Sequence, residues 1–230
     1  MRDDLLVFDL GFSCYKDADA IQRNIIRKRK SNSVPDCIIL SELKGIFTIG
    51  RAGSRKNLLI DESLLAQHGI DIMDVDRGGD ITYHGPGQIV AWPIIDLSRH
   101  KKDVAWFIDK LEDALIGCIN ASGINAKKIN GLRGAWANDG KIASIGIGIS
   151  KWITYHGLCI NVNPNLEYFS FINPCGLKGI KVTSFYAELN KMADMDKVKS
   201  DFLNSLKNVL GYNNLAYAKS NRIVPEKIYC

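Results

Sequence analysis

The chain has 230 residues, of which 46% are hydrophobic and 24% are charged, as is usual for a folded globular protein. This composition excludes a disordered, collagenous or coiled-coil chain. The 30 basic and 25 acidic side chains leave a formal charge of +5, which is too small to indicate nucleic-acid binding and equally fits an enzyme with acidic partners. No apolar run reaches the roughly eighteen residues of a membrane span, and the acidic start MRDDLLVFDLG is unlike a signal peptide, so a cytoplasmic location is expected.

Hydrophobic periodicity and capping residues predict the first half of the fold. The expected elements are a strand over 5–10, a helix over 17–30, strands over 37–43 and 45–50 around a tight turn, and a short helix over 61–69. Asp17 is expected to cap the first helix, whose last four residues are all basic and suit the negative end of the helix dipole.

The second half of the chain combines long amphipathic helices with hairpins. The expected elements are a helix over 103–121 that Asp103 caps, a helix over 195–210 that Gly211 follows, and strands between 133 and 162, with turns at Asn138-Asp139-Gly140 and Ser150-Lys151. This mixture predicts an α+β fold, in which helices cover a mixed or largely antiparallel sheet. Without a repeat, linker or shift in composition, a single domain over residues 1–230 is expected.

Six cysteines are scattered through the chain with no CxxC pair, which indicates reduced thiols rather than a disulfide framework. Cys175 lies between a proline and a glycine on a predicted loop, where a neighbouring cation would favour a reactive thiolate. The apolar surroundings of Cys37, Cys118 and Cys159 favour a role in the core instead. The four histidines form no metal-binding motif, so no metal site is expected.

The most glycine-rich stretch of the chain is RGGDITYHGPGQ at residues 77–88. Its glycines allow a positive φ and a close approach of the backbone to a ligand, but a plain connection between strands would explain them as well. The stretch is neither a P-loop nor a dinucleotide-binding fingerprint, because both spacings are absent.

Alternation in the strand over 141–149 leaves Gly146 and Gly148 on one face and a row of isoleucines on the other. The two glycines could form a bed for an apolar chain, although close packing of a helix is the more common reason for such a face. Simple alternation places Lys141 on the isoleucine face, but a twist or bulge at the strand end could redirect it.

Together these segments resemble the octanoyltransferases of lipoate biosynthesis, the lipoate–protein ligase B family. The resemblance rests on RGGDITYHGPGQIVAWPIIDL at 77–97, ANDGKIASIGIGISKWITYHGLCINVN at 137–163 and FINPCGL at 171–177. It implies the fold of the catalytic domain of biotin and lipoate protein ligases. It also implies transfer of an octanoyl group from octanoyl-acyl carrier protein to a lysine amine of lipoyl domains, in 2-oxoacid dehydrogenases and in the glycine cleavage H protein.

The resemblance also implies roles for particular residues. Cys175 would form the acyl-thioester and Lys141 would tune it. The substrate would be bound by Arg77, Gly78, Gly79, Asp80, Ile81, Thr82, Tyr83, His84, Ser144, Ile145, Gly146, Gly157, Leu158 and Cys159. Asp80, Trp92 and Cys159 depart from the usual residues of the family, and Cys159 would place a second thiol in the pocket. No cofactor, metal, nucleic acid or membrane is implied, and a monomer is expected.

Three other interpretations compete with this one, of which a catalytically silent scaffold of the same fold is disfavoured because Lys141 and Cys175 are both present. An ATP-dependent lipoate or biotin ligase of the same fold would activate a free acid and would need no cysteine. A basic nucleic-acid-binding module would fit the charge, but aromatic residues are not interleaved with the basic run at the end of the first predicted helix.

Overall fold

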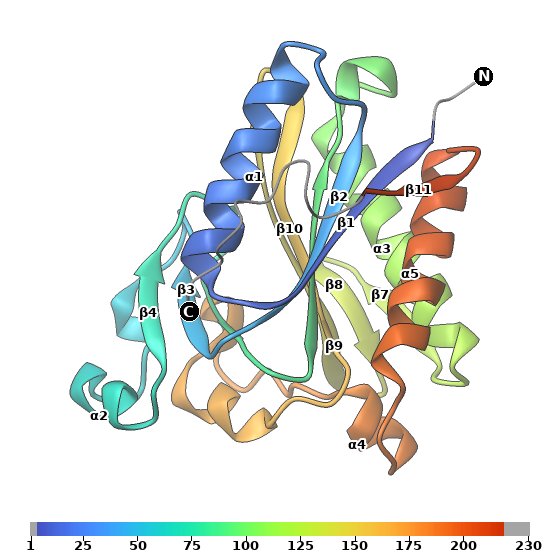
Figure 1. Cartoon of the computed structure of the whole chain (residues 1–230). Coiled ribbons are helices and arrows are strands. Elements are labelled where there is room, and N and C mark those ends of the chain that lie inside the picture. The colour runs from blue at the N-terminus through green and yellow to red at the C-terminus, as the bar shows by residue number, and fades with distance from the viewer. Residues whose placement is uncertain (1–3, 219–230) are drawn as a thin grey trace.

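The computed structural model describes residues 4–218, and its centre is a sheet of eight strands in the order β11-β1-β2-β6-β10-β9-β8-β7 (Figure 1). Strands β11 and β2 run parallel to β1, and all other neighbours are antiparallel, so the predicted mixed sheet is confirmed. The strands are Leu5–Ser13 (β1), Cys37–Leu43 (β2), Gln88–Ile94 (β6), Ala126–Ile129 (β7), Leu132–Ala137 (β8), Gly140–Ser150 (β9), Ile153–Asn161 (β10) and Leu215–Tyr217 (β11).

Helices cover both faces of this sheet (Figure 1). Helix α1 (Tyr15–Lys30) lies on one face, and α3 (Val104–Ala121) and α5 (Met195–Leu210) lie on the other, while α2 (Glu62–Gln67) and α4 (Phe185–Leu189) are short. None of the helices within residues 4–218 is long and apolar enough to span a membrane.

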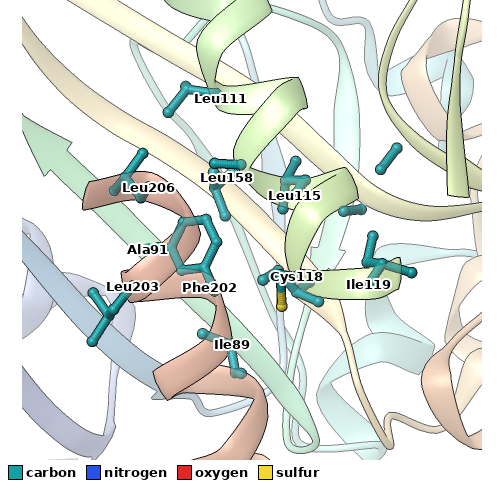
Figure 2. Close-up of a cluster of buried hydrophobic side chains, with 14 of the residues drawn as sticks. Ile89, Ala91, Leu111, Leu115, Cys118, Ile119, Leu158, Phe202, Leu203 and Leu206 are labelled. Atoms are coloured by element: carbon teal, nitrogen blue, oxygen red, sulfur yellow. The ribbon is translucent and has the colours of Figure 1, made fainter. Parts of the chain in front are cut away.

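The largest hydrophobic core lies between the sheet and the pair α3 and α5. Figure 2 shows Leu115 of α3 and Phe202 of α5 over Ala91 and Leu158 of the central strands, and all four side chains are buried. A second cluster joins α1 to the opposite face of the same strands. Burial of a large apolar side chain contributes about 1.5–3 kcal/mol, so these two clusters hold the sheet as a rigid platform.

The ends of the long helices follow from their capping residues. Asp103 accepts a hydrogen bond from the backbone N–H of Trp106, and Gly211 ends α5 with φ 74°, as the sequence predicted. Helix α1 differs from the prediction, because it begins at Tyr15 with Cys14 as its N-cap residue. Asp17 lies inside the first turn, where its carboxylate accepts a hydrogen bond from the Cys14 thiol instead of capping backbone N–H groups.

A smaller sheet of three strands stands beside the main one, in the order β4-β3-β5. Its strands are β3 (Ile46–Ile49), β4 (Asp71–Asp74) and β5 (Ile81–His84). The tight hairpin expected between residues 37–43 and 45–50 is therefore wrong, although both strands exist. Both edges of β2 are occupied by β1 and β6, so the chain leaves the main sheet after β2 and pairs β3 with β4 and β5.

The predicted turns on both sides of β9 are confirmed. Asn138 has φ 48° between β8 and β9, and Lys151 and Trp152 have φ 53° and 66° between β9 and β10, values that suit tight hairpins. The pairing of β8 with β9 slips by one residue, because Ala135 lies opposite Ala143 whereas Trp136 lies opposite Lys141. Ile142 is therefore the extra residue of a bulge next to Lys141.

Candidate active site

A cavity opens between the α1 face of the main sheet and the glycine-rich segment that leads into β5. The residues that line it are Tyr15, Arg77, Gly79, Asp80, Ile81, Thr82, His84, Val90, Trp92, Ser144, Ile145, Gly146, His156, Gly157, Leu158, Cys159 and Cys175. Apolar surface makes up the larger part of the lining, and polar groups are contributed by Tyr15, Arg77, Asp80, Thr82, His84, Ser144 and His156. A largely apolar pocket with converging polar groups is typical of a binding site for a small molecule.

The buried side chain of Arg77 holds the glycine-rich segment in place. Its Nη2 donates to the carbonyl oxygen of Thr48 at 2.7 Å, to Thr48 Oγ1 at 2.9 Å and to the carbonyl oxygen of Asp80 at 2.7 Å, and its Nη1 donates to the carbonyl oxygen of Gly78 at 2.9 Å. These acceptors are neutral oxygens, and burial lowers the pKa of the guanidinium. The glycine-rich segment forms the roof of the cavity. Arg77 therefore gives the cavity a buried positive charge and fixes this roof to β3.

The carboxylate of Asp80 connects the cavity roof to the loop that carries Cys175. It accepts hydrogen bonds from the backbone N–H of Ser54 at 3.2 Å and from Asn57 Nδ2 at 2.7 Å. A Cβ atom on Gly176 would lie 2.4 Å from Asp80 Oδ2, so only glycine allows this close approach beside Cys175. Asn173 also donates its backbone N–H to the carbonyl oxygen of Asn57 at 2.8 Å, which docks the loop on the same segment.

Cys175 and Lys141 meet at the mouth of the cavity. Lys141 Nζ donates a hydrogen bond to Cys175 Sγ over 3.1 Å. Cys175 lies on an exposed turn over Pro174–Gly176 and has φ 60°, a conformation that few residues other than glycine adopt without cost. Left-handed residues outside glycine cluster at functional sites, where surrounding contacts hold them.

The buried Lys141 is fixed through both its backbone and its side chain. Its backbone N–H donates to the carbonyl oxygen of Lys181 at 2.8 Å, and its own carbonyl accepts from Thr183 at 3.0 Å. Its ammonium lies 5.5 Å from the centre of the Trp136 ring, close enough for a cation–π contact. Because the bulge at Ile142 breaks the alternation of β9, counting residues along the strand does not give the direction of this side chain.

Gly134 makes room for the lysine. It has φ 116°, and a Cβ atom there would lie 2.3 Å from the carbonyl oxygen of Ala143 and 2.9 Å from Lys141 Cε. The backbone N–H of Gly134 donates to Glu112 at 3.0 Å, a buried carboxylate of α3. The path of Lys141 therefore depends on a glycine and an acidic residue that carry no recognisable local motif.

Two predicted binding residues lie elsewhere. Tyr83 alternates with Thr82 and His84 along β5, so its ring points away from the cavity and packs against Phe47 and Phe169 in a third cluster. Gly78 lies outside the cavity lining, because its backbone N–H pairs with the carbonyl oxygen of Ile147 and it faces a neighbouring groove.

Of Gly146 and Gly148, the two β9 glycines that could form a bed for an apolar chain, only one faces the cavity. Gly146 lines it, and a Cβ atom at this position would lie 2.9 Å from the carbonyl oxygen of Gly78 and 3.0 Å from Arg77 Cδ. The expectation for Gly148 is wrong, because the ring of Tyr155 on β10 covers it, 2.3 Å from where a Cβ would be. Gly148 therefore allows close packing within the sheet.

Cys159 lies in the cavity wall and is buried, and burial raises the pKa of its thiol. It is therefore poorly suited to act as a nucleophile, unlike the exposed Cys175. Cys14, Cys37 and Cys118 form no disulfide and lie away from the cavity lining, and Cys230 lies outside the described residues.

Another part of the cavity wall is formed by a hydrogen-bonded row of side chains that no sequence motif predicted. His156 Nε2 lies 2.7 Å from Asp76 Oδ1, and its Nδ1 lies 3.4 Å from the hydroxyl of Tyr15. Burial lowers the pKa of His156 against the opposing effect of Asp76. Burial would raise the pKa of Asp76, but hydrogen bonds from His156 and Arg23 outweigh it and hold that pKa at about 2. A neutral His156 then donates to Asp76 and accepts from Tyr15.

Acid is expected to destabilise the protein through His84, whose side chain is 7% exposed. Burial and the nearby Arg77 lower its pKa to about 3, and its Nδ1 has no hydrogen-bond partner. Its ordinary pKa is about 6.5, so the unfolded chain takes up the proton first. Stability is then complete above about pH 6.5 and falls as the pH approaches 3, by about 2 kcal/mol at pH 5. Urea unfolding at pH 7 and pH 5 measures this loss. In His84→Gln the loss of unfolding free energy between pH 7 and pH 5 should be smaller by that amount. An equal loss in the variant and the wild-type chain would contradict the prediction.

Comparison with known proteins agrees with this arrangement. The profile of the lipoyl protein ligase A/B catalytic domain matches residues 14–207. An octanoyltransferase of Solibacter usitatus is 38% identical over 206 residues, which cover 90% of this chain and 93% of the relative.

Solved structures share the fold at much lower sequence identity. A bi-partite lipoate protein ligase of Thermoplasma acidophilum superposes with a TM-score of 0.74 at 14% identity, covering 95% of this chain and 88% of the ligase chain. A biotin protein ligase of Aquifex aeolicus gives 0.54 at 11% identity, covering 92% and 71%. These similarities confirm the predicted ligase-type α+β fold. With the residues matched by the family profile and by the relative, they show that the chain belongs to the lipoyl protein ligase A/B catalytic-domain family and, within it, to the octanoyltransferases.

Proposed function

We propose that this octanoyltransferase moves an octanoyl group from octanoyl-acyl carrier protein to a lysine amine of a lipoyl domain through a thioester on Cys175. The observation that carries the proposal is the contact of 3.1 Å between Lys141 Nζ and Cys175 Sγ at the mouth of an apolar cavity. An exposed thiol paired with a buried ammonium suits a nucleophile whose thiolate must form at neutral pH.

In the first step the Cys175 thiolate attacks the carbonyl carbon of the donor thioester. The bond from that carbon to the donor sulfur breaks, and the departing thiolate takes a proton from the Lys141 ammonium. One thioester replaces another, so little free energy is lost. The octanoyl chain lies along Gly146, Leu158 and Cys159 in the apolar wall.

In the second step the acceptor lysine attacks the Cys175 thioester as a neutral amine. Its excess proton passes to the Lys141 amine, and Cys175 leaves as a thiolate, which restores the starting ion pair. The product is an amide, which is more stable than a thioester and makes the transfer effectively complete.

The developing negative charge on the carbonyl oxygen needs a donor. The backbone N–H groups of Gly176 and Leu177 already donate to Asn173 and Pro174 within the turn. The Lys141 ammonium and the buried Arg77 are the positive groups at hand, and positive charge placed at a developing oxyanion is an effective stabiliser.

We further propose that the acceptors are lipoyl domains of 2-oxoacid dehydrogenases and the glycine cleavage H protein, and that the chain acts as a single-domain monomer without a cofactor. A cytoplasmic location fits a reaction that needs a reduced Cys175.

Transfer without ATP tests this function against the ATP-dependent ligase of the same fold. The wild-type chain is mixed with octanoyl-acyl carrier protein and a lipoyl domain, and intact mass spectrometry follows both proteins. We expect an octanoylated lipoyl domain and, when the acceptor is omitted, one octanoyl adduct that peptide mapping places on Cys175. Transfer from free octanoate only when ATP is present would establish the ligase instead. An adduct mainly on Cys159 would overturn the site.

A further inference from the structure

The cavity under Arg77 that would hold the octanoyl chain is called the acyl cavity. A second cavity, called the outer groove, meets the acyl cavity at Cys175. Gly79, Ile145, Gly146 and Cys175 line both cavities. The apolar wall of the outer groove is formed by Val104, Ile108, Leu132, Trp136, Leu177 and Ile180. Val104 and Leu177 are 41% and 42% exposed and both line this groove, which leaves apolar surface there for another molecule.

The proposed reaction requires an exit for the second part of the substrate. A thioester has an acyl chain on one side of its carbonyl carbon and a thiol arm on the other. If the acyl chain occupies the cavity under Arg77, the thiol arm must leave Cys175 in another direction. The outer groove begins at the same sulfur and at Lys141, which would protonate the departing thiolate.

The charges of the outer groove select an anionic arm. Lys141 and Arg133 are the charged side chains among its described lining residues, and both are positive. The side chain of Arg133 is 55% exposed and reaches Glu112 at only 3.3 Å, so its guanidinium remains open to a second partner. Lys178 and Lys181 are exposed on the segment that carries Leu177 and Ile180. A lysine ammonium from an acceptor would meet like charge along this path.

We infer that the outer groove binds the phosphopantetheine arm of the acyl donor, with its apolar part against Val104, Trp136 and Leu177 and its phosphate at Arg133. This inference rests on the proposed function, because it identifies the thiol that leaves in the first step. Planar guanidinium groups pair well with phosphate oxygens, and the exposed apolar lips would be covered only when a donor is bound.

Donors with arms of different length test the groove independently of the chemistry. Octanoyl thioesters of phosphopantetheine, of pantetheine and of N-acetylcysteamine carry the complete arm, the arm without phosphate and only the end next to sulfur. The acylation rate of Cys175 is measured with each donor by mass spectrometry. Val104→Glu is expected to slow acylation by the phosphopantetheine donor about tenfold, because the new carboxylate repels the phosphate and interrupts the apolar lip. Acylation by the N-acetylcysteamine donor should change less than about twofold.

The variant has a matched control. An acidic residue is favourable in the first turn of a helix, so Val104→Glu should not impair folding of α3. Leu64→Glu introduces the same charge at a position that is also 41% exposed, on α2 and outside both cavities, and it should leave all three rates unchanged.

Arg133 is tested by its preference for phosphate. Arg133→Ala should reduce the advantage of the phosphopantetheine donor over the pantetheine donor about two- to fivefold, as expected for an exposed ion pair, and Arg133→Lys should retain part of it. Val104→Glu that slows all three donors equally, or slows only transfer to the lipoyl domain, would overturn the inference. If no donor acylates Cys175 in the wild-type chain, the proposed function itself fails.

Discussion

Replacement of Cys175 by alanine is expected to lower octanoyl transfer by at least about 10³-fold and to remove the acyl adduct entirely. Without the thiol the acceptor lysine would have to attack the carrier-protein thioester directly, in an encounter of two large proteins. The acyl-enzyme replaces that encounter with two easier steps. Steady-state transfer and intact mass spectrometry of the variant measure both effects.

The partner Lys141 makes this prediction specific for a pair. Lys141→Ala alone should slow acylation about 10²-fold, as is typical for loss of a proton-transfer group. The double variant Cys175→Ala/Lys141→Ala should lose little more activity than Cys175→Ala alone, because the effects of substitutions at residues that act as a unit are not additive. Cys159→Ser is the control thiol substitution and should retain most of the activity. Equal losses from Cys175→Ala and Cys159→Ser would contradict the assignment of the nucleophile.

Local sequence patterns are sufficient for the elements that form by short-range rules. Asp103, Gly211 and the turn at Asn138 predicted element ends because capping and hairpin geometry are determined within a few residues. The hairpin expected between β2 and β3 failed for the opposite reason. Whether two consecutive strands pair depends on which other strands occupy their edges, and β1 and β6 occupy both edges of β2.

The candidate site also combines residues that a local pattern predicts with residues that only the folded chain brings together. The loops of Arg77 and Cys175 carry recognisable residues, whereas their partners come from distant parts of the chain. Thr48 lies 29 positions from Arg77, and Tyr15 lies 141 positions from His156, with no shared motif. The direction of Lys141 was open in the sequence because a one-residue bulge, visible only in the strand register, determines it.

Arg77 is where the long-range contacts of the site are most concentrated. Its guanidinium joins β3 to the glycine-rich segment before β5, through backbone oxygens of Thr48, Gly78 and Asp80. The bonds to the Thr48 carbonyl and hydroxyl oxygens are buried, so they cannot simply pass to bulk water, whereas those to Gly78 and Asp80 are partly buried. Arg77 therefore holds the roof of the acyl cavity together with backbone hydrogen bonds from Gly50, Arg51 and Ala52 to the carbonyl oxygens of Asp80, Arg77 and Gly79.

Arg77→Met is accordingly expected to lower the free energy of unfolding by about 2–4 kcal/mol, because the two Thr48 oxygens lose this donor in the interior and a buried acceptor left without a donor costs about 1–3 kcal/mol. Chemical unfolding with urea measures the loss, and acylation of Cys175 should fall with it because the cavity roof and the buried charge are both lost. Arg77→Lys keeps the charge but cannot reproduce the planar fork, so its loss should be intermediate. Arg55→Met removes an exposed arginine that pairs with Glu62 and Asp74, and it should change stability little. If Arg77→Met unfolds at the same urea concentration as the wild-type chain, the acceptors must have found other donors, and the roof would not depend on Arg77.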